Sequence, residues 1–287
     1  MPELPEVESL ARFLEKRCVA HAVARAELVA FPCLKTAGVP LAALGGLVVE
    51  TVRRRGKFLC LGLGGCWLVT HLAHAGWLVW RDEMPAQPAR PSRNPLAFRL
   101  VLDDGSGFDL TEAGTRKSLA IYLVGDPLDV PNLATLGPEP LDAAFTPAQL
   151  DAILDRAGGA HLKGVLRDQR IIAGVGNAYS DEILWAARLS PYAACGRLDA
   201  SHRAVLYDAI QTVLTAAIDD LAGLDARDLK PHKKAGFRVH ARTGEPCPAC
   251  GTTIAEVSFA ESSLQYCPTC QTGGKTLADR RLSRLLK

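Results

Sequence analysis

Two Cys-x2-Cys pairs near the carboxyl end constrain the fold of this chain more than any other feature. Cys247 and Cys250 form the first pair, Cys267 and Cys270 form the second, and sixteen residues separate them. This spacing is typical of a ribbon that brings four thiolates to one tetrahedral Zn2+. Four thiolates leave no open coordination position, so the metal should be structural. A redox dithiol is the alternative, and two pairs at ribbon spacing make it unfavourable. The sequence therefore predicts one structural Zn2+ per chain.

The cysteine count also limits where the protein works. Nine cysteines in 287 residues form an odd set in a chain too long for a small disulfide scaffold. No apolar run approaches the ~18 residues of a membrane span, and the amino terminus lacks the pattern of a secretory signal. We expect a cytoplasmic protein with no membrane partner. The five cysteines outside the pairs are expected to be buried small hydrophobes. They are Cys18, Cys33, Cys60, Cys66 and Cys195.

The first half of the chain predicts one helix followed by antiparallel strands. Residues 5–17 carry apolar side chains at helical spacing, with acidic residues at the start, where the helix dipole favours them. Short β-rich runs broken by Gly, Pro and Asp follow, and at this spacing they indicate an antiparallel sandwich or flattened barrel. The residues Asp103-Asp104-Gly105 predict a hairpin between the last two runs. The runs are 46–52, 58–63, 67–72, 96–102 and 108–111.

The second half of the chain predicts helices. After a linker rich in Pro and Gly, helical patterns cover about 147–156, 161–167, 178–188 and 201–221. Residues 222–240 are expected to form a basic, loop-like bridge. The longest helix is expected to pack through one face, made of Val205, Ala209, Val213, Ala216 and Ala217.

These patterns predict an α+β multidomain protein. The first domain, 1–137, is expected to hold the amino-terminal helix and the antiparallel β-sandwich. A linker at 138–147 leads to a helical domain at 148–240, which includes the basic bridge. The zinc ribbon is expected to occupy 241–287.

Positive charge is unevenly distributed along the chain. The formal net charge is only +2, yet residues 53–57 read Arg-Arg-Arg-Gly-Lys, and residues 225–287 hold 11 Lys and Arg against 6 Asp and Glu. Two basic patches on a nearly neutral chain are compatible with a nucleic-acid-binding cleft. A solvated charged face is the commoner reason for such runs, so charge alone leaves both interpretations open.

The amino terminus offers an unusual nucleophile. Pro2 follows Met1, and a small residue at this position permits removal of the initiator methionine. The exposed secondary amine would titrate near ~8, against ~10.4 for lysine, so much more of it would be uncharged at neutral pH. Such an amine can attack C1′ of a sugar and form a Schiff base. From this stretch alone, the simpler interpretation is a terminal residue followed by a helix-capping acid, Glu3.

Several motifs lie in a fixed order over nearly the whole chain. They are Pro2-Glu3-Leu4-Pro5-Glu6-Val7-Glu8, Arg54-Arg55-Gly56-Lys57, His71-Leu72-Ala73, Leu136-Gly137-Pro138-Glu139-Pro140, Lys163 with Gly174-Val175-Gly176-Asn177-Ala178-Tyr179, and the zinc ribbon after Gly244-Glu245-Pro246. In combination they resemble the formamidopyrimidine-DNA glycosylase/endonuclease VIII family of base-excision repair enzymes. The combination is very specific, although a single piece such as Gly-x-Gly is not.

The resemblance implies a bifunctional DNA glycosylase and AP lyase that acts on damaged bases or abasic sites in duplex DNA. By similarity, Pro2 is the nucleophile at C1′, and Glu3 manages protons on the sugar and the Schiff base. Lys57, in a hairpin turn, would contact the phosphate near the lesion and assist β-elimination. The chemistry suits these residue types. The alternative for Lys57 is an ordinary exposed hairpin lysine.

The resemblance also implies a helix–two-turn–helix element that binds the DNA backbone. Glycines let the backbone approach a phosphate closely, and Asn177 opens a helix whose free N–H groups attract anions. Asn177 and Lys163 are carried over as DNA contacts, with an ordinary helix cap as the alternative. Glu182 matches a family acid near the site. The zinc hairpin would hold DNA as well, and the protein would be a monomer associated with the nucleoid.

Three positions depart from the family pattern. His74 stands where the formamidopyrimidine branch has a methionine wedge, and Arg116 is no more than a possible substitute for its intercalating arginine. Ser262 stands where the zinc hairpin has an arginine that binds phosphate and is assigned to δ-elimination. Arg242, which we count among the DNA contacts, and Lys275 could compensate. Recognition of the opposite base and the second strand cleavage are therefore both in doubt.

Two other classes of function remain open at this stage. A damaged-DNA binder that kept the scaffold and lost turnover would explain the three departures. A zinc-ribbon regulator would instead bind a specific duplex sequence without regard to lesions. Retention of Pro2, Glu3 and Lys57 together favours the enzyme, because binding requires none of that triple.

Overall fold

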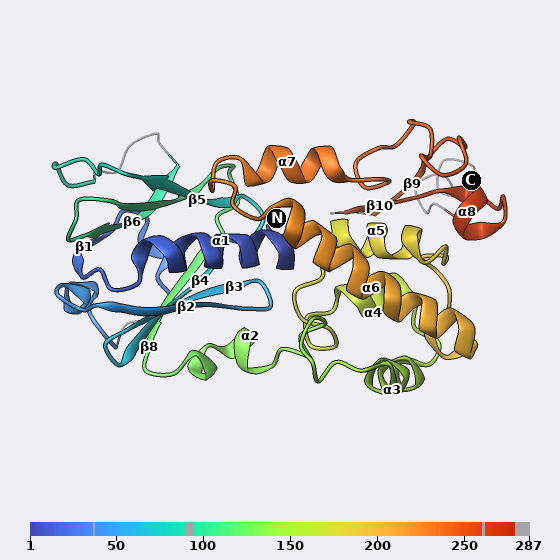
Figure 1. Ribbon diagram of the computed structural model, residues 1–287, viewed down its shortest axis with the longest axis horizontal. Coiled ribbons are helices and arrows are strands. Elements are labelled where there is room, and N and C mark those ends of the chain that lie inside the picture. The colour runs from blue at the N-terminus through green and yellow to red at the C-terminus, as the bar shows by residue number, and fades with distance from the viewer. Residues whose placement is uncertain (37, 90–94, 260–261, 279–287) are drawn as a thin grey trace. The chain divides into compact units, whose positions relative to one another are not determined.

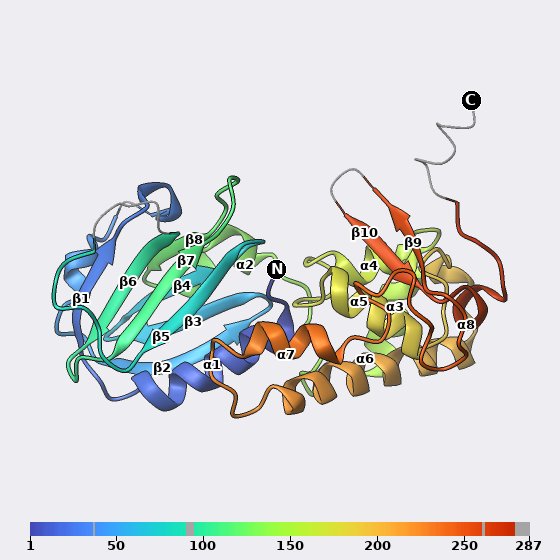
Figure 2. The same ribbon diagram turned by 90° about the horizontal axis from the view of Figure 1, so that it is seen from above.

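The computed structural model describes residues 1–36, 38–89, 95–259 and 262–278, and it divides them into two compact units. The first unit contains Met1–Thr135 and Leu221–Lys230, and the second contains Leu136–Asp220 and the chain from Pro231 onward. Figure 1 and Figure 2 show the elements of each unit. None of the helices in the described part of the chain combines the length and apolar character that spanning a bilayer requires. The four-part division made from the sequence stays a prediction.

The first unit is built from one long helix and two four-stranded antiparallel sheets. One sheet has the strand order β1-β6-β7-β5, and the other has the order β2-β3-β4-β8. The expected helix and antiparallel sandwich are confirmed. The elements are α1 Leu4–Cys18, β1 Val23–Leu28, β2 Val49–Arg55, β3 Phe58–Leu63, β4 Cys66–His71, β5 Gly76–Arg81, β6 Leu96–Leu102, β7 Gly107–Glu112, β8 Ala120–Val124 and the short helix α2 Pro131–Ala134, with 3-10 turns at Phe31–Cys33, Leu41–Leu44 and Pro127–Asp129.

The predicted strands agree with the structure except at one end. The run at 46–52 is displaced, because β2 begins at Val49 and continues through the arginines to Arg55. Strands β1, β5 and β8 lie outside the five runs singled out above but within the β-rich stretch expected from about residue 20 to 125. The hairpin at Asp103-Asp104-Gly105 is confirmed by the antiparallel pairing of β6 with β7, in which Val101 lies opposite Gly107.

The core of the first unit lies between the two sheets and is closed on one side by α1. Leu10 and Leu14 of α1 join one cluster of buried side chains with Leu61 of β3 and Phe98 of β6. In both views α1 runs along the edge between the two layers (Figures 1 and 2). Burial of these side chains stabilises the unit by roughly 1.5–3 kcal/mol each. The helix is therefore fixed by the sandwich, and its first turn is held in a defined place.

The second unit combines a helical part with the cysteine ribbon. The predicted helices are confirmed, with ends that differ by a residue or two, and a small hairpin carries the ribbon. The elements are α3 Pro147–Ala157, α4 Leu162–Arg167, α5 Asn177–Ala186, a 3-10 turn at Cys195–Arg197, α6 Ala200–Asp220, β9 Ala255–Ser258, β10 Ser263–Tyr266 and α8 Pro268–Thr272, and α7 Leu229–Gly236 spans the division between the units.

The buried face of α6 differs from the prediction. Only Ala209 of the five predicted residues is buried, and Val205 is 46% exposed. The helix turns its larger leucine and isoleucine side chains inward, because they remove more apolar surface from water than Ala or Val does. The residues buried are Leu206, Ala209, Ile210, Leu214 and Ile218.

The segment predicted as a loop-like bridge contains a helix, so that prediction is wrong for 229–236. The helix α7 buries only Leu229, so its sequence has no apolar periodicity from which a helix could be predicted. Pro231 is tolerated because it falls in the first turn, where its missing N–H has no helical partner. Lys230 Nζ lies 4.4 Å from the ring centre of Trp77 in the first unit. Lys233 Nζ lies 5.0 Å from that of Tyr179 in the second. These cation–π contacts stabilise lysines that the sequence presented as solvated.

Candidate active site and DNA-binding residues

The start of α1 holds the first two candidate catalytic residues in place. Glu3 is the N-cap residue, and its backbone N–H donates to Glu6 Oε2 at 2.7 Å. The Glu3 side chain in turn accepts from the backbone of Glu6, which completes a capping box. Glu3 is 3% exposed, Glu6 is fully buried, and Pro2 is buried beside them. The local sequence thus fixes Pro2 and Glu3 at the positive end of a helix.

Lys57 occupies the two-residue turn between β2 and β3, as the sequence predicts. Gly56 has φ +54°, a left-handed conformation that this tight turn requires. Arg54 donates to Glu8 Oε2 on α1 at 3.0 Å and to the carbonyl oxygen of Gly56 at 3.1 Å. Lys57 is only 5% exposed, so the alternative of an ordinary exposed hairpin lysine is wrong. Arg54 therefore connects the first turns of α1 with the turn that carries Lys57.

His71 belongs to the same neighbourhood and was not predicted as a site residue. It ends β4 opposite Phe58, with the two ring centres 4.8 Å apart. Burial, with the charges of Lys57 and His74 adding to it, lowers the pKa of His71 to about 4. The imidazole is therefore neutral at pH 7. The sequence did contain a signal for this residue. The Gly56-Lys57 turn predicts antiparallel pairing of the strands that follow, and this pairing places His71 next to the turn.

His74 and Arg116 lie on two exposed connections of the first unit. His74 is in the turn between β4 and β5, and Arg116 is in the loop between β7 and β8. The buried carboxylate of Glu112 fixes the base of that loop, because it accepts the backbone N–H of Ser118 at 2.6 Å and that of Leu119 at 2.8 Å. The sequence predicted that both residues contact DNA, and that role stays a prediction.

Asn177 is the first residue of α5 and follows the predicted glycine turn. Gly174 has φ +84°, which supports the choice of glycine there. Asn177 Nδ2 donates to the carbonyl oxygen of Ser263 on the zinc hairpin at 2.8 Å. Its Oδ1 is buried and has no hydrogen-bond partner among the described residues. Asn177 thus joins the helix–turn element to the ribbon, and its predicted phosphate contact stays a prediction.

Lys163 is buried in an ion pair. It is 4% exposed, and its Nζ donates to Asp181 Oδ1 at 2.6 Å, to Ser180 Oγ at 2.9 Å and to the carbonyl oxygen of Asn177 at 3.0 Å. The other carboxylate oxygen of Asp181 lies 2.8 Å from His240 Nδ1. An ammonium has three donors, and all three are used inside the unit. The expected contact of Lys163 with the DNA backbone stays a prediction. Its three hydrogen bonds all reach residues of α5, so the lysine positions that helix.

Glu182 connects α5 to the segment that leads into the ribbon. Its carboxylate accepts three backbone N–H groups, from Arg238 at 2.8 Å, Val239 at 3.0 Å and His240 at 2.8 Å. Burial raises the pKa of Glu182, and these hydrogen bonds oppose the rise. The carboxylate that the sequence placed near the site is thus an anchor within the second unit.

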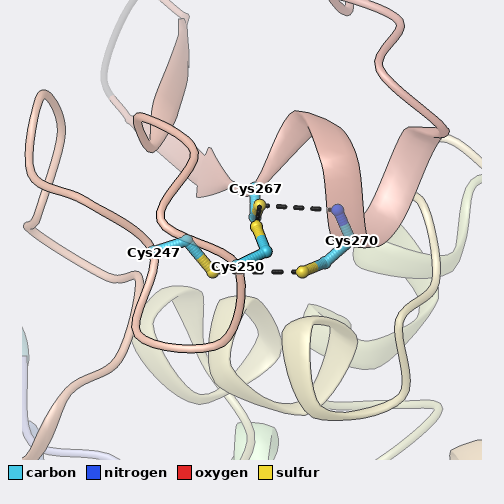
Figure 3. A group of neighbouring side chains, drawn as sticks. All are labelled: Cys247, Cys250, Cys267 and Cys270. Carbon is cyan, nitrogen blue, oxygen red and sulfur yellow. Dashed lines mark hydrogen bonds between the residues drawn. The ribbon is translucent and has the colours of Figure 1, made fainter.

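The four ribbon cysteines come together as predicted (Figure 3). Their sulfur atoms all lie within 4.8 Å of one another, with 4.0 Å between Cys247 and Cys270 and 3.4 Å between Cys250 and Cys267. Tetrahedral Zn–S bonds of ~2.3 Å would place the sulfurs about 3.8 Å apart. A hydrogen bond from Thr252 lowers the pKa of Cys250 to about 6, whereas burial raises the pKa of Cys267 and of Cys270, so the case for the metal rests on the geometry of the four sulfurs. The donor set fits Zn2+ and has no open position.

Arg242, a predicted DNA contact, and Ser262, a departure from the family pattern, lie on or near this ribbon. Arg242 Nη1 donates to Glu245 Oε2 at 2.9 Å, and its side chain is 37% exposed. The carbonyl oxygen of Ser262 accepts the backbone N–H of Phe259 at 2.7 Å. The basic residues at 280–287 of the predicted patch lie outside the described residues.

Three family models match the chain in succession. They are the formamidopyrimidine-DNA glycosylase N-terminal domain at residues 1–121, the formamidopyrimidine-DNA glycosylase H2TH domain at 136–227, and the zinc finger found in FPG and IleRS at 244–273. The chain belongs to the formamidopyrimidine-DNA glycosylase family. The resemblance seen in the sequence is therefore confirmed, together with the fold class and the four-cysteine zinc finger.

Whole-chain comparisons agree with this assignment to the glycosylase family. The formamidopyrimidine-DNA glycosylase of Chloroflexus aggregans is 36% identical over 94% of this chain and 98% of its own length. An uncharacterized formamidopyrimidine-DNA glycosylase-like protein of Mycobacterium tuberculosis is 52% identical over 55% of this chain and 98% of its own length. The Lactococcus lactis glycosylase, solved with DNA containing an abasic site, is 28% identical with a TM-score of 0.81, covering 94% of this chain and 99% of its own. The Thermus thermophilus enzyme is 32% identical with a TM-score of 0.78, covering 96% and 100%.

Proposed function

We propose that this protein is a DNA glycosylase and AP lyase that removes damaged, chiefly oxidised, bases from duplex DNA. Pro2, Glu3 and Lys57 carry the chemistry. The observation that carries the proposal is the buried capping box, which holds Glu3 and the residue before it at the start of α1. A helix cap does not require a proline in front of it, whereas a nucleophilic amine does require a rigid, defined position. The relatives named above support the substrate class.

The reaction follows from the properties of an amino-terminal proline. After Met1 is removed, the secondary amine attacks C1′ of the damaged nucleotide, the C1′–N bond breaks, and the base leaves with a proton. The sugar ring opens as Glu3 donates a proton to O4′, and an iminium ion forms between Pro2 and C1′. Loss of a C2′ proton then expels the 3′ phosphate, and water hydrolyses the iminium to free the enzyme.

The neighbours of the triple suit this chemistry. Lys57 supplies a cation for the phosphate near the lesion, and the neutral His71 beside it can donate a hydrogen bond without adding charge. Asn177, His74, Arg116 and Arg242 are proposed to contact DNA directly, and Lys163 is proposed to support the backbone contact by positioning α5 through its ion pair with Asp181. The zinc ribbon supplies structure, and no chemical step depends on the metal. Extrusion of the damaged nucleotide would cost a few kcal/mol, least for a damaged pair.

A borohydride trapping experiment tests the proposal. The purified protein is incubated with duplex DNA that contains one abasic site, and borohydride reduces any iminium to a stable adduct. The wild type should form a covalent complex, and Pro2→Ala should lose most of it. Glu3→Gln should slow adduct formation by about 10²-fold or more, the usual contribution of a general acid. Glu15→Gln is the matched control, because Glu15 is exposed on the same helix.

Two outcomes would contradict the proposal. If the folded wild type binds the abasic duplex but forms no adduct and leaves the strand intact, the protein is a damage binder without turnover. If intact-mass analysis of active protein shows that Met1 is still attached, Pro2 has no free amine and another nucleophile must act.

A further inference from the structure

A cavity of about 430 Å3 lies entirely within the second unit, whereas the three proposed catalytic residues belong to the first unit. Its wall comes from His161 and α4, from the turn at Pro191 and Tyr192, and from residues of the zinc ribbon. The ribbon residues are Phe259 after β9, Leu264 of β10 and Ala278. Pockets that bind small molecules usually enclose about 300–1,000 Å3. The cavity is therefore large enough for a small organic ligand.

Aromatic side chains form much of this wall. His161 and Tyr192 stack on each other, with ring centres 5.0 Å apart and an angle of 23° between the planes. Phe259 lies on another part of the lining and is 38% exposed, which is unusual for a phenylalanine. Leu264 adds an aliphatic surface. Such a lining favours a flat, unsaturated ring, which can pack on aromatic faces with little loss of conformational freedom.

The charged residues of the cavity favour an anion. Lys163 lines it, but its ammonium is already compensated by Asp181. Arg167 lines it too, and among the described residues its guanidinium has no hydrogen bond and no ion pair. No aspartate or glutamate belongs to the lining formed by the described residues. A guanidinium with all five donors available matches the geometry of a phosphate group.

We propose that this cavity of the second unit is a nucleotide-binding site. The heterocyclic ring packs against the aromatic wall of Phe259 and the stacked His161 and Tyr192. The phosphate pairs with Arg167. The ligand is either a free mononucleotide or a single nucleotide at the end of a DNA strand, because both present the same ring and phosphate. In the second case the cavity holds a strand end while the proposed lyase acts elsewhere.

Isothermal titration and saturation-transfer NMR on the full-length, zinc-loaded protein test this site. The probes are deoxyadenosine monophosphate, deoxyadenosine and inorganic phosphate, each titrated alone. We expect the monophosphate to bind more tightly than either fragment, because only it satisfies both halves of the cavity. A 5′-phosphorylated single-stranded trinucleotide forms the second arm. Tighter binding of the trinucleotide assigns the site to strand ends, and tighter binding of the monophosphate assigns it to free nucleotides.

Variants at the cavity provide the controls. Arg167→Gln should weaken binding of the monophosphate about tenfold, the equivalent of about 1.4 kcal/mol. Arg170→Gln is the matched control, because Arg170 is 75% exposed, pairs with Asp168 and does not line the cavity. His161→Ala should weaken binding of the nucleoside and the monophosphate but not of phosphate. Zinc content and circular dichroism establish that each variant is folded.

The proposal is overturned if the folded wild type binds no monophosphate at millimolar concentration. It is also overturned if Arg167→Gln and Arg170→Gln weaken binding equally, since the effect would then be general positive charge. Adduct formation at Pro2 is measured separately, so failure of this site leaves the proposed catalytic function untouched.

Discussion

Replacement of Lys163 by methionine distinguishes a structural lysine from a DNA-binding one. The lysine and Asp181 have side-chain exposures of 5% and 0%, so removal of the ammonium leaves a buried carboxylate that keeps only the imidazole of His240 as a side-chain partner among the described residues. Loss of one member of a buried ion pair costs about 3–5 kcal/mol. Methionine retains the aliphatic stem, so lost packing adds little. We expect Lys163→Met to lower the free energy of unfolding by about 3 kcal/mol or more.

Urea denaturation followed by circular dichroism measures this loss, which should move the midpoint by about 1 M or more. Asp181→Asn and the double variant complete a mutant cycle, and the double variant should lose less than the sum of the two single losses. Lys16→Met is the control for removal of a positive charge, because Lys16 is exposed on α1.

The reasoning is refuted if Lys163→Met unfolds at the wild-type urea concentration. In that case the lysine would act on DNA, and the salt dependence of binding to an abasic duplex should fall by about one phosphate contact. A lysine confined to the ion pair leaves that slope unchanged in the folded variant.

Two more predictions follow from buried groups. The pKa of His71 is about 4 in the folded protein, below the unfolded value of 6.5. The contribution of His71 to the free energy of unfolding is therefore fully present above pH 6.5 and falls by up to about 3 kcal/mol as the pH drops to 4. The urea midpoints of the wild type and of His71→Asn, plotted against pH, measure this loss, and equal slopes for the two proteins would contradict it. Removal of zinc by a chelator should unfold the ribbon alone, because Cys247 and Cys267 are half of its small core cluster with Val239 and Ile254. Hydrogen exchange should then rise in 244–278 and stay unchanged in β3, and full protection of the ribbon without zinc would disprove this.

The sequence alone determined the features whose partners are near in the chain. The Cys-x2-Cys spacing specified a four-thiolate metal site, because two such knuckles offer the four thiolates that a tetrahedral ion takes. The acids at the start of α1 and the Gly56-Lys57 turn fixed their own local geometry through capping and left-handed backbone. The cap, the turn and each single cysteine pair are interactions over two to four residues. The two cysteine pairs lie sixteen residues apart, and their repeated Cys-x2-Cys spacing shows that they belong together.

Only the tertiary structure decided what happens to charged residues. Lys163 has its partner 18 residues away, and Glu182 accepts N–H groups 56–58 residues away, so no local pattern could assign either of them to the interior. The same holds for α7, which is stable through rings from distant elements, and for His71, whose neutrality comes from burial beside Lys57. Whether a charged side chain is buried depends on all the groups that the fold places around it. Most of these groups are distant in the chain, so no short stretch of sequence predicts the burial.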